Sequence, residues 1–370
     1  MTQPLRDTGE SILFSLRSLY GQHGYSHYKM NKFEEYDLYA HNKDFLISDS
    51  VITFTDGNGK LLALKPDVTL SIVKNSRDRS DVLQKLYYNE NVYRMSKGSR
   101  NFKEIMQVGL ECIGKVDDYC VYEVLKLAQK SLDVISRNNV LSVSHLGILS
   151  EVMDNIGVPG GSKADVLHLI GEKNLHELGS LLGKLGVCEG SIDLLRRLLS
   201  IRGRTDEVLI KAGELLCGVV SDDTMAHFTS VLSALSSEKN LSIDFTVVGD
   251  INYYNGFVFK GFVEGIPTSL LSGGQYDMLM RKMGRSSEAI GFAVYLDMIE
   301  QYIRKPEKYD VDVVLLYDST SLLSQIGEEV QRLTEGGESV LSTSVLPLQV
   351  KYRKLLKMQN GRVDIVETNA

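Results

Sequence analysis

Two acids and a glutamine occur where they could together recognise a small amine. Asp67 and Thr69 lie two residues apart after the apolar run 61–64. Gln107 and Glu111 lie four residues apart in a stretch of strand character, so both point to one face and can reach one ligand. A buried carboxylate without a cationic partner is costly. Two acids and a glutamine buried together would therefore require a cationic or donor-rich group between them.

The cysteines and histidines do not form a pattern typical of a metal site. The four cysteines are widely and irregularly spaced: Cys112, Cys120, Cys188 and Cys217. This spacing fits reduced thiols better than a disulfide framework or a zinc site. His168 and His176 are eight residues apart, whereas two metal ligands on adjacent helical turns would be four apart. We expect no metal and no cofactor.

The composition is typical of a globular protein of two or three domains. The chain has 370 residues, 43% of them apolar and 24% charged, with a formal net charge of -7. The acidic balance argues against a chain that mainly grips a polyanion, so tRNA is not an expected partner. The apolar runs are short and the first residues lack a signal-peptide pattern, so we expect a cytoplasmic protein without a membrane span.

The first part of the chain predicts a sheet with two helices. Apolar residues at helical spacing between Ile12 and Tyr20 follow the possible caps Asp7 and Thr8. The segment 52–64 is typical of a β-hairpin, because its Asp-Gly and Asn-Gly pairs accept positive φ at low cost. Residues 84–94 and 105–113 predict two further strands. A long helix follows over 121–135, opened by Asp117 or Asp118.

The remaining chain predicts a helical segment, more strands and a small α/β unit. Residues 149–240 form Leu/Ile-rich helical segments, a candidate helical insertion. Strand character returns at 243–248 and 257–263, and a helix is expected from Gly291 onward. Beyond residue 308, strands are expected at 311–317, near Val340 and at 363–366, with a helix over 322–333. The expected divisions are 1–148, 149–240, 241–304 and 308–370.

Several stretches resemble the histidyl-tRNA synthetase family, over residues 1–300. Residues 62–69 resemble its Leu-Arg-Pro-Glu-x-Thr pattern, with Lys65 in place of the arginine. Tyr93-Arg94 with 107–111 looks like motif 2 of class II synthetases. Residues 252–259 resemble the histidine-specific Asp-Tyr-Tyr-Thr-x-x-Val-Phe stretch, and 273–277 are close to Gly-Gly-Arg-Tyr-Asp.

The resemblance implies an α+β fold and a histidine pocket. The fold would be an antiparallel sheet of the class II aminoacyl-tRNA synthetase kind, flanked by helices, with a helical insertion and a small C-terminal α/β module. In the family the acid and threonine of the first pattern contact the substrate's amino group. The residues implied to bind histidine are Asp67, Thr69, Arg94, Gln107, Glu111, Tyr253 and Tyr254.

Departures from the family fall on the residues that drive its ATP chemistry. Gly249 stands where an arginine contacts the substrate carboxylate, and Met298 stands where the motif 3 arginine holds the ATP phosphates. The acid that normally follows Arg94 by two residues is Ser96. Motif 1 lacks its usual proline within 29–34. Removing one electrostatic stabiliser typically costs about 2.7 to 4 kcal/mol of transition-state energy, so losing two or more should abolish activation.

A synthetase-like chain that keeps histidine recognition and loses ATP chemistry resembles the regulatory subunits of ATP phosphoribosyltransferase. That resemblance implies a non-catalytic homodimer within a hetero-oligomer, whose partner is a short-form catalytic subunit. Histidine would act as an allosteric ligand that controls the first step of histidine biosynthesis, and the coupling must be reciprocal. Whether histidine occupies the synthetase-like pocket or the subunit contact stays open.

Other interpretations of the same residues also stay open. The chain could be a divergent histidyl-tRNA synthetase in which other residues replace the missing arginines; Gly249 and Met298 argue against this. It could instead bind RNA or modify a protein lysine, but the acidic charge disfavours RNA and the missing arginines disfavour ligation. Finally, Asp67, Gln107 and Glu111 could be inherited structural residues without a ligand.

Overall fold

The chain folds into two compact units. The computed structural model describes residues 8–43, 46, 50–78, 82–95, 101–249, 253–302, 308–346 and 348–369. The larger unit spans residues 6–303 and the smaller unit begins at residue 304. The predicted α+β class is confirmed.

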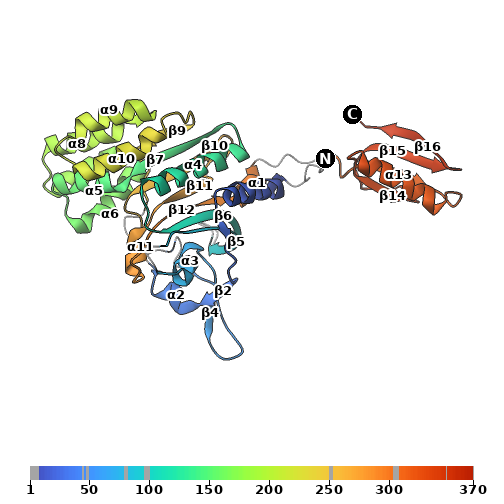
Figure 1. Cartoon of the computed structure of the whole chain (residues 1–370), viewed down its shortest axis with the longest axis horizontal. Coiled ribbons are helices and arrows are strands. Elements are labelled where there is room, and N and C mark those ends of the chain that lie inside the picture. Colours follow the sequence, from blue (N-terminus) through green and yellow to red (C-terminus); the bar gives the residue numbers. More distant parts are fainter. Residues whose placement is uncertain are drawn as a thin grey trace. The chain divides into compact units, whose positions relative to one another are not determined.

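A nine-stranded sheet forms the centre of the larger unit (Figure 1). Its strands are, in spatial order, β1 (Ser26–His27), β5 (Gln84–Met95), β6 (Phe102–Gly114), β12 (Glu288–Tyr295), β11 (Leu271–Gln275), β10 (Phe257–Val263), β7 (Asn139–His145), β9 (Leu241–Asp244) and β8 (Arg202–Gly203). Pairing is antiparallel from β5 to β7, while β1–β5 and β7–β9 are parallel. The strands predicted at 84–94, 105–113 and 257–263 are therefore confirmed.

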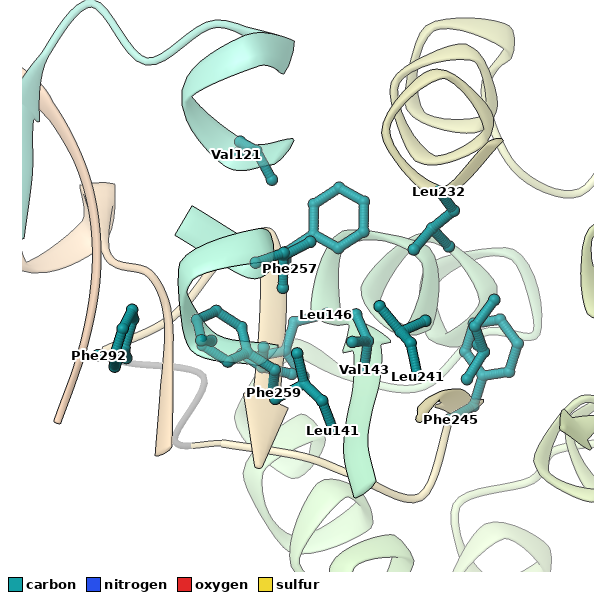
Figure 2. Packing of buried hydrophobic residues seen from close by; sticks show 14 of the residues in the cluster. Val121, Leu141, Val143, Leu146, Leu232, Leu241, Phe245, Phe257, Phe259 and Phe292 are labelled. Carbon is teal, nitrogen blue, oxygen red and sulfur yellow. The ribbon is translucent and has the colours of Figure 1, made fainter. Parts of the chain in front are cut away.

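The two faces of the sheet differ because strand residues alternate. On β6, Val108, Leu110 and Cys112 are buried in a hydrophobic core with α1 (Thr8–Gln22) and α4 (Asp118–Ile135). Asp117 caps α4 by accepting a hydrogen bond from the Cys120 backbone N–H at 2.9 Å. The intervening β6 residues face the other way. This core also contains Val121 of α4, Leu232 of the helical segment and Phe257 of β10 (Figure 2).

The segment predicted to be helical contains six α-helices and packs against the β7 end of the sheet (Figure 1). They are α5 (Leu146–Asn155), α6 (Lys163–Gly171), α7 (Leu175–Lys184), α8 (Glu189–Ser200), α9 (Thr205–Leu216) and α10 (Asp222–Ala234), with a short 3₁₀ helix at Gly160–Ser162. Phe228 of α10 stacks on Phe257 of β10 at 5.9 Å between ring centroids. The helices therefore share one hydrophobic core with the sheet.

A small sheet and short helices cover the opposite face. β2 (Phe33–Glu35), β4 (Leu61–Leu64) and β3 (Thr53–Thr55) are antiparallel, which confirms the predicted hairpin. Gly59 has φ +81° in its turn, and Asp56 Oδ1 accepts from the backbone N–H of Asn58 and of Lys60, each at 2.8 Å. Nearby lie α2 (Tyr36–Ala40), α3 (Thr69–Asn75) and α11 (Asp277–Lys282), which contribute to a second hydrophobic cluster.

The helix expected from Gly291 onward is wrong at its start. Residues Glu288–Tyr295 form β12, and the helix α12 (Leu296–Tyr302) begins only afterwards. β12 lies between β6 and β11, so its backbone is paired on both sides. Phe292 and Val294 enter the core with α4, while Gly291 and Ala293 face the other side. Successive side chains of β12 point to opposite faces of the sheet and are buried on both, which is typical of a central strand.

The C-terminal unit is an α/β module with its own hydrophobic cluster. Its sheet has the order β14 (Val340–Thr343), β13 (Val311–Tyr317), β15 (Tyr352–Gln359) and β16 (Arg362–Thr368), with helix α13 (Leu323–Glu335). The first three strands are parallel and β16 is antiparallel. The strands at 311–317, 340 and 363–366 and the helix over 322–333 were predicted. In the described parts of both units, no helix has the length and hydropathy to cross a membrane.

Candidate functional site

The face of the sheet opposite α4 holds a cavity of about 470 Å³. Its volume lies within the range of small-molecule sites, about 300 to 1,000 Å³. All seven residues that the resemblance implied line it, and so does Gly249: the seven are Asp67, Thr69, Arg94, Gln107, Glu111, Tyr253 and Tyr254. Residues from four separate stretches of the chain, 67–69, 94, 107–111 and 249–254, are thus brought to one site.

Strand register sets the floor of the cavity. Lys260 of β10 pairs with Ser272 of β11, which pairs with Ala293 of β12. Ala293 in turn pairs with Gly109 of β6. Directly paired residues point to the same face, so these positions form one row across the sheet. The residues in the middle of this row, Ser272 and Ala293, have small side chains. At its end, a Cβ on Gly109 would lie 2.5 Å from the Tyr88 hydroxyl oxygen.

The neighbouring row carries Glu111 at one end. Glu111 pairs with Gly291, and Gly291 pairs with Gly274. A Cβ on Gly291 would lie 1.8 Å from Glu111 Oε2, so only glycine leaves room for this carboxylate. Thr69 Oγ1 donates to Oε1 at 2.9 Å and the Tyr276 hydroxyl donates to Oε2 at 2.6 Å.

Burial controls the charge of Glu111. Desolvation raises the pKa of Glu111 to about 8, although the hydrogen bonds from Tyr276 and Thr69 work in the opposite direction. Two hydrogen bonds from neutral hydroxyls do not replace the lost hydration of a carboxylate. Burial therefore favours the protonated, neutral form of Glu111, and a cationic or donor-rich ligand would favour the ionised form.

Asp67 and Arg94 form the second charged element of the cavity. Arg94 Nη2 lies 3.3 Å from Asp67 Oδ2, and Arg94 Nε donates to the Pro66 carbonyl oxygen at 2.7 Å. The other Asp67 oxygen accepts from the Leu70 backbone N–H at 3.0 Å, at the start of α3. Arg94 therefore holds Asp67 in place and is itself held by the Pro66 carbonyl group.

Hydrogen bonds to Asp277 hold Asn255, the residue that follows the Tyr253–Tyr254 pair. Asn255 Nδ2 donates to Asp277 Oδ2 at 2.8 Å, and the Asp277 backbone N–H donates back to Asn255 Oδ1 at 3.0 Å. Gln275 Oε1 accepts from the Phe257 backbone N–H at 2.8 Å. These bonds hold the segment that follows the pair, and both tyrosines line the cavity.

The two positions that lack the family's arginines differ in placement. Gly249 lines the cavity, and a Cβ there would lie 2.6 Å from Tyr254 Cδ2. The Tyr254 ring thus occupies the space that a longer side chain at 249 would need. Met298 is not among the lining residues; its sulfur accepts from Thr268 Oγ1 at 3.4 Å. Ser96 and Asn252 lie outside the described residues.

Lys65, which replaces a family arginine, is structural. Its ammonium is buried and lies 2.8 Å from Glu90 Oε2. Burial lowers the pKa of Lys65, and the bond to Glu90 counteracts that shift. Among the residues that the structure describes, no cluster of histidine, cysteine or carboxylate side chains could hold a metal ion.

The sequence did not single out several cavity residues: Tyr88, Lys260, Ser272, Tyr276 and Tyr295. Tyr276 lies inside the 273–277 motif, so its place in the site beside Glu111 could have been predicted from the family resemblance. Lys260 carries a signal of its own, because it is a charged residue within the apolar strand sequence Phe257–Val263. The remaining members depend on cross-strand register, which the motifs do not contain.

The raised pKa of Glu111 predicts a pH-dependent stability. An acid with a folded-state pKa of about 8, against the ordinary 4.5, binds its proton more tightly when folded. Its stabilising effect is complete below pH 4.5 and is lost as the pH rises to 8. Glu111→Gln should therefore gain stability relative to the wild type between pH 5 and 8, by at most roughly 4 kcal/mol. Urea unfolding of both proteins measures this difference, and parallel pH profiles would contradict the assignment.

Comparison with known proteins identifies the family. Residues 6–299 match the family model described as histidyl-tRNA synthetase. A protein of Clostridium kluyveri named ATP phosphoribosyltransferase regulatory subunit is 28% identical, over 87% of this chain and 85% of its own. One of the same name from Bacillus cereus is 25% identical, over 85% and 77%.

Solved structures show the same fold. A Bacillus halodurans structure, described as an ATP phosphoribosyltransferase regulatory subunit/histidyl-tRNA synthetase, superposes with a TM-score of 0.76 at 22% identity, covering 96% of this chain and 97% of the other. Histidyl-tRNA synthetase from Nostoc gives 0.75 at 15% identity, over 97% and 93%. A chain of the ATP phosphoribosyl transferase complex of Thermotoga maritima gives 0.60 at 19% identity, over 79% and 98%. With a family model matched over 6–299, the chain belongs to the histidyl-tRNA synthetase family.

Proposed function

We propose that this chain is a non-catalytic, cytoplasmic regulatory subunit of ATP phosphoribosyltransferase, which controls the first step of histidine biosynthesis. The relatives that match most of its length carry that name. The observation that carries the proposal is the composition of the cavity. It combines Asp67, Thr69, Gln107 and Glu111 with Gly249 at the position of the family's carboxylate-binding arginine.

Amino-acid activation requires positive charge at defined positions, and two positions where the family has arginines for this reaction are Gly249 and Met298 here. The reaction develops negative charge on the transferred phosphate, and preorganised cations stabilise it. Gly249 supplies no charge and the Tyr254 ring fills the space beside it. Arg94 is engaged with Asp67 and Pro66. Loss of synthetase activity follows from these contacts as part of the proposal.

Histidine is the ligand that the cavity's acids favour. An ammonium group near Asp67 and Thr69 would gain a charged partner. A ring N–H donor near Glu111 would stabilise its ionised form and so lower the cost of burying it. Gln107 on the same strand face as Glu111 offers one amide acceptor and two N–H donors. The assignment of Asp67 and Thr69 to the ammonium group is the one that the resemblance to the synthetase motif implies.

Regulation follows as linkage between two binding events. The partner is a short-form catalytic subunit, and the complex has an active and an inactive state. Histidine that binds the inactive state more tightly shifts the assembly toward it, and the catalytic subunit's state alters histidine affinity by the same factor. The chain itself catalyses nothing in this scheme.

The first prediction of this proposed function concerns catalysis. The purified chain should show no histidine-dependent exchange between ATP and pyrophosphate, because Gly249 and Met298 replace the cations of that reaction. A genuine histidyl-tRNA synthetase in the same assay is the positive control. Exchange at a synthetase-like rate would remove the regulatory interpretation in favour of a divergent synthetase.

The second prediction concerns binding. Glu111→Gln should weaken histidine binding by about 10- to 100-fold, because hydrogen bonds to a charged group contribute about 1.5 to 3 kcal/mol. Calorimetry on the wild type and the variant measures this ratio. The exposed substitution Glu177→Gln on α7 is the matched control and should leave binding unchanged. If the wild type binds histidine no better than Glu111→Gln, alone and with its catalytic partner, these residues are structural relics.

The third prediction concerns assembly. We propose a homodimer through the first hundred residues, where exposed apolar side chains gather on the small sheet. Phe33 and Phe54 are 47% and 39% exposed and pack edge to face at 5.5 Å on one face of that sheet. Such a patch favours burial against a second copy. Light scattering at micromolar concentration should give twice the chain mass, and a strict monomer would contradict the dimer.

A further inference from the structure

Among the residues that the structure describes, four charged side chains line the cavity, and one of these four has no described partner. Asp67 and Arg94 pair with each other, and Glu111 accepts two hydroxyl hydrogen bonds. Lys260 is the fourth. Within the part of the chain that the structure describes, no hydrogen bond or ion pair involves its ammonium group, and burial alone lowers its pKa.

The sheet register places Lys260 and Glu111 at opposite ends of the floor. Glu111 is on β6 and Lys260 is on β10, with β12 and β11 between them. Adjacent strands lie about 4.8 Å apart, so three steps separate the two backbones by about 14 Å. The Glu111 carboxylate already lies over Gly291 on β12. An extended lysine side chain spans part of the remaining distance to β10. The gap between the two charged groups can then hold a molecule the size of an amino acid.

The residues between these two charges are small. Ser272 and Ala293 lie in the row of Lys260, and Gly274 and Gly291 lie in the row of Glu111. Ser272 pairs directly with Lys260, and its hydroxyl is 3.1 Å from the Tyr295 hydroxyl. These two hydroxyl groups are neutral and cannot act as a counter-ion. A partly buried ammonium without a counter-ion is unfavourable, and an anion bound beside it would relieve that cost.

We propose that Lys260 binds the carboxylate of the amino acid held in this cavity. It supplies, from β10, the positive charge that Gly249 cannot supply. The ligand would then lie across the floor, with its donor groups toward Glu111 and Asp67 and its carboxylate toward Lys260. This inference rests on the proposed histidine recognition and adds the residue that distinguishes an amino acid from its amino alcohol.

The test compares histidine with histidinol, which has a hydroxymethyl group in place of the carboxylate. Calorimetry should show the wild type binding histidine at least about tenfold more tightly than histidinol, since a charged hydrogen bond is lost. Lys260→Met keeps most of the side-chain length without the charge. It should bind histidine at least tenfold more weakly and histidinol unchanged. Lys184→Met, at an exposed position of α7, is the control and should match the wild type.

The outcomes separate this inference from the proposed function. If Lys260→Met still prefers histidine over histidinol by the wild-type factor, the role of Lys260 is wrong while histidine recognition stands. The same follows if the variant loses ATP binding but keeps histidine binding, because the lysine would then serve a phosphate. If the wild type binds neither compound, alone or with the catalytic subunit, histidine recognition and the role of Lys260 both fail. Thermal melting of each variant checks that it is folded.

Discussion

The burial of the Glu111 carboxylate is the constraint on which the site depends. The antiparallel pairing of β6 with β12 puts this side chain directly over Gly291, where any Cβ would collide with it. Thr69 from α3 and Tyr276 from the start of α11 both donate to it. One carboxylate therefore joins the central sheet to two elements that cover it. Its raised pKa is the cost of this arrangement, and a donor-rich ligand is what lowers that cost.

Much of the site could be predicted because it is encoded locally. Gln107 and Glu111 share a face through the period of a strand, which needs no knowledge of the partner strand. The Tyr253–Tyr254 and Gly273–Gly274 stretches are short motifs whose order along the chain is recognisable. The positions of Lys260 and Tyr88 could not be predicted in this way, because they depend on register across four strands.

One error and one omission in the predicted fold, at β12 and β11, have the same origin. The strand β11 reads Leu-Ser-Gly-Gly-Gln, which resembles a loop. Its glycines are needed because a Cβ at Gly273 would lie 2.4 Å from Phe292 Cβ, and one at Gly274 would lie 2.8 Å from Tyr254 Cδ1. Residues 291–295 were expected in a helix for want of any local sign that β6 pairs with them. Tertiary contacts override propensity at these positions.

In the proposed function, the chain keeps histidine binding without activation chemistry and reports the histidine concentration to a catalytic partner. The direct measurement is phosphoribosyltransferase activity of the complex reconstituted from this chain and a short-form catalytic subunit, titrated with histidine. We expect histidine to inhibit the wild-type complex. Linkage requires that Glu111→Gln move the inhibition midpoint to higher histidine, by the factor by which it weakens histidine binding to that complex. No inhibition of the wild-type complex, or an unchanged midpoint with Glu111→Gln, would contradict the account.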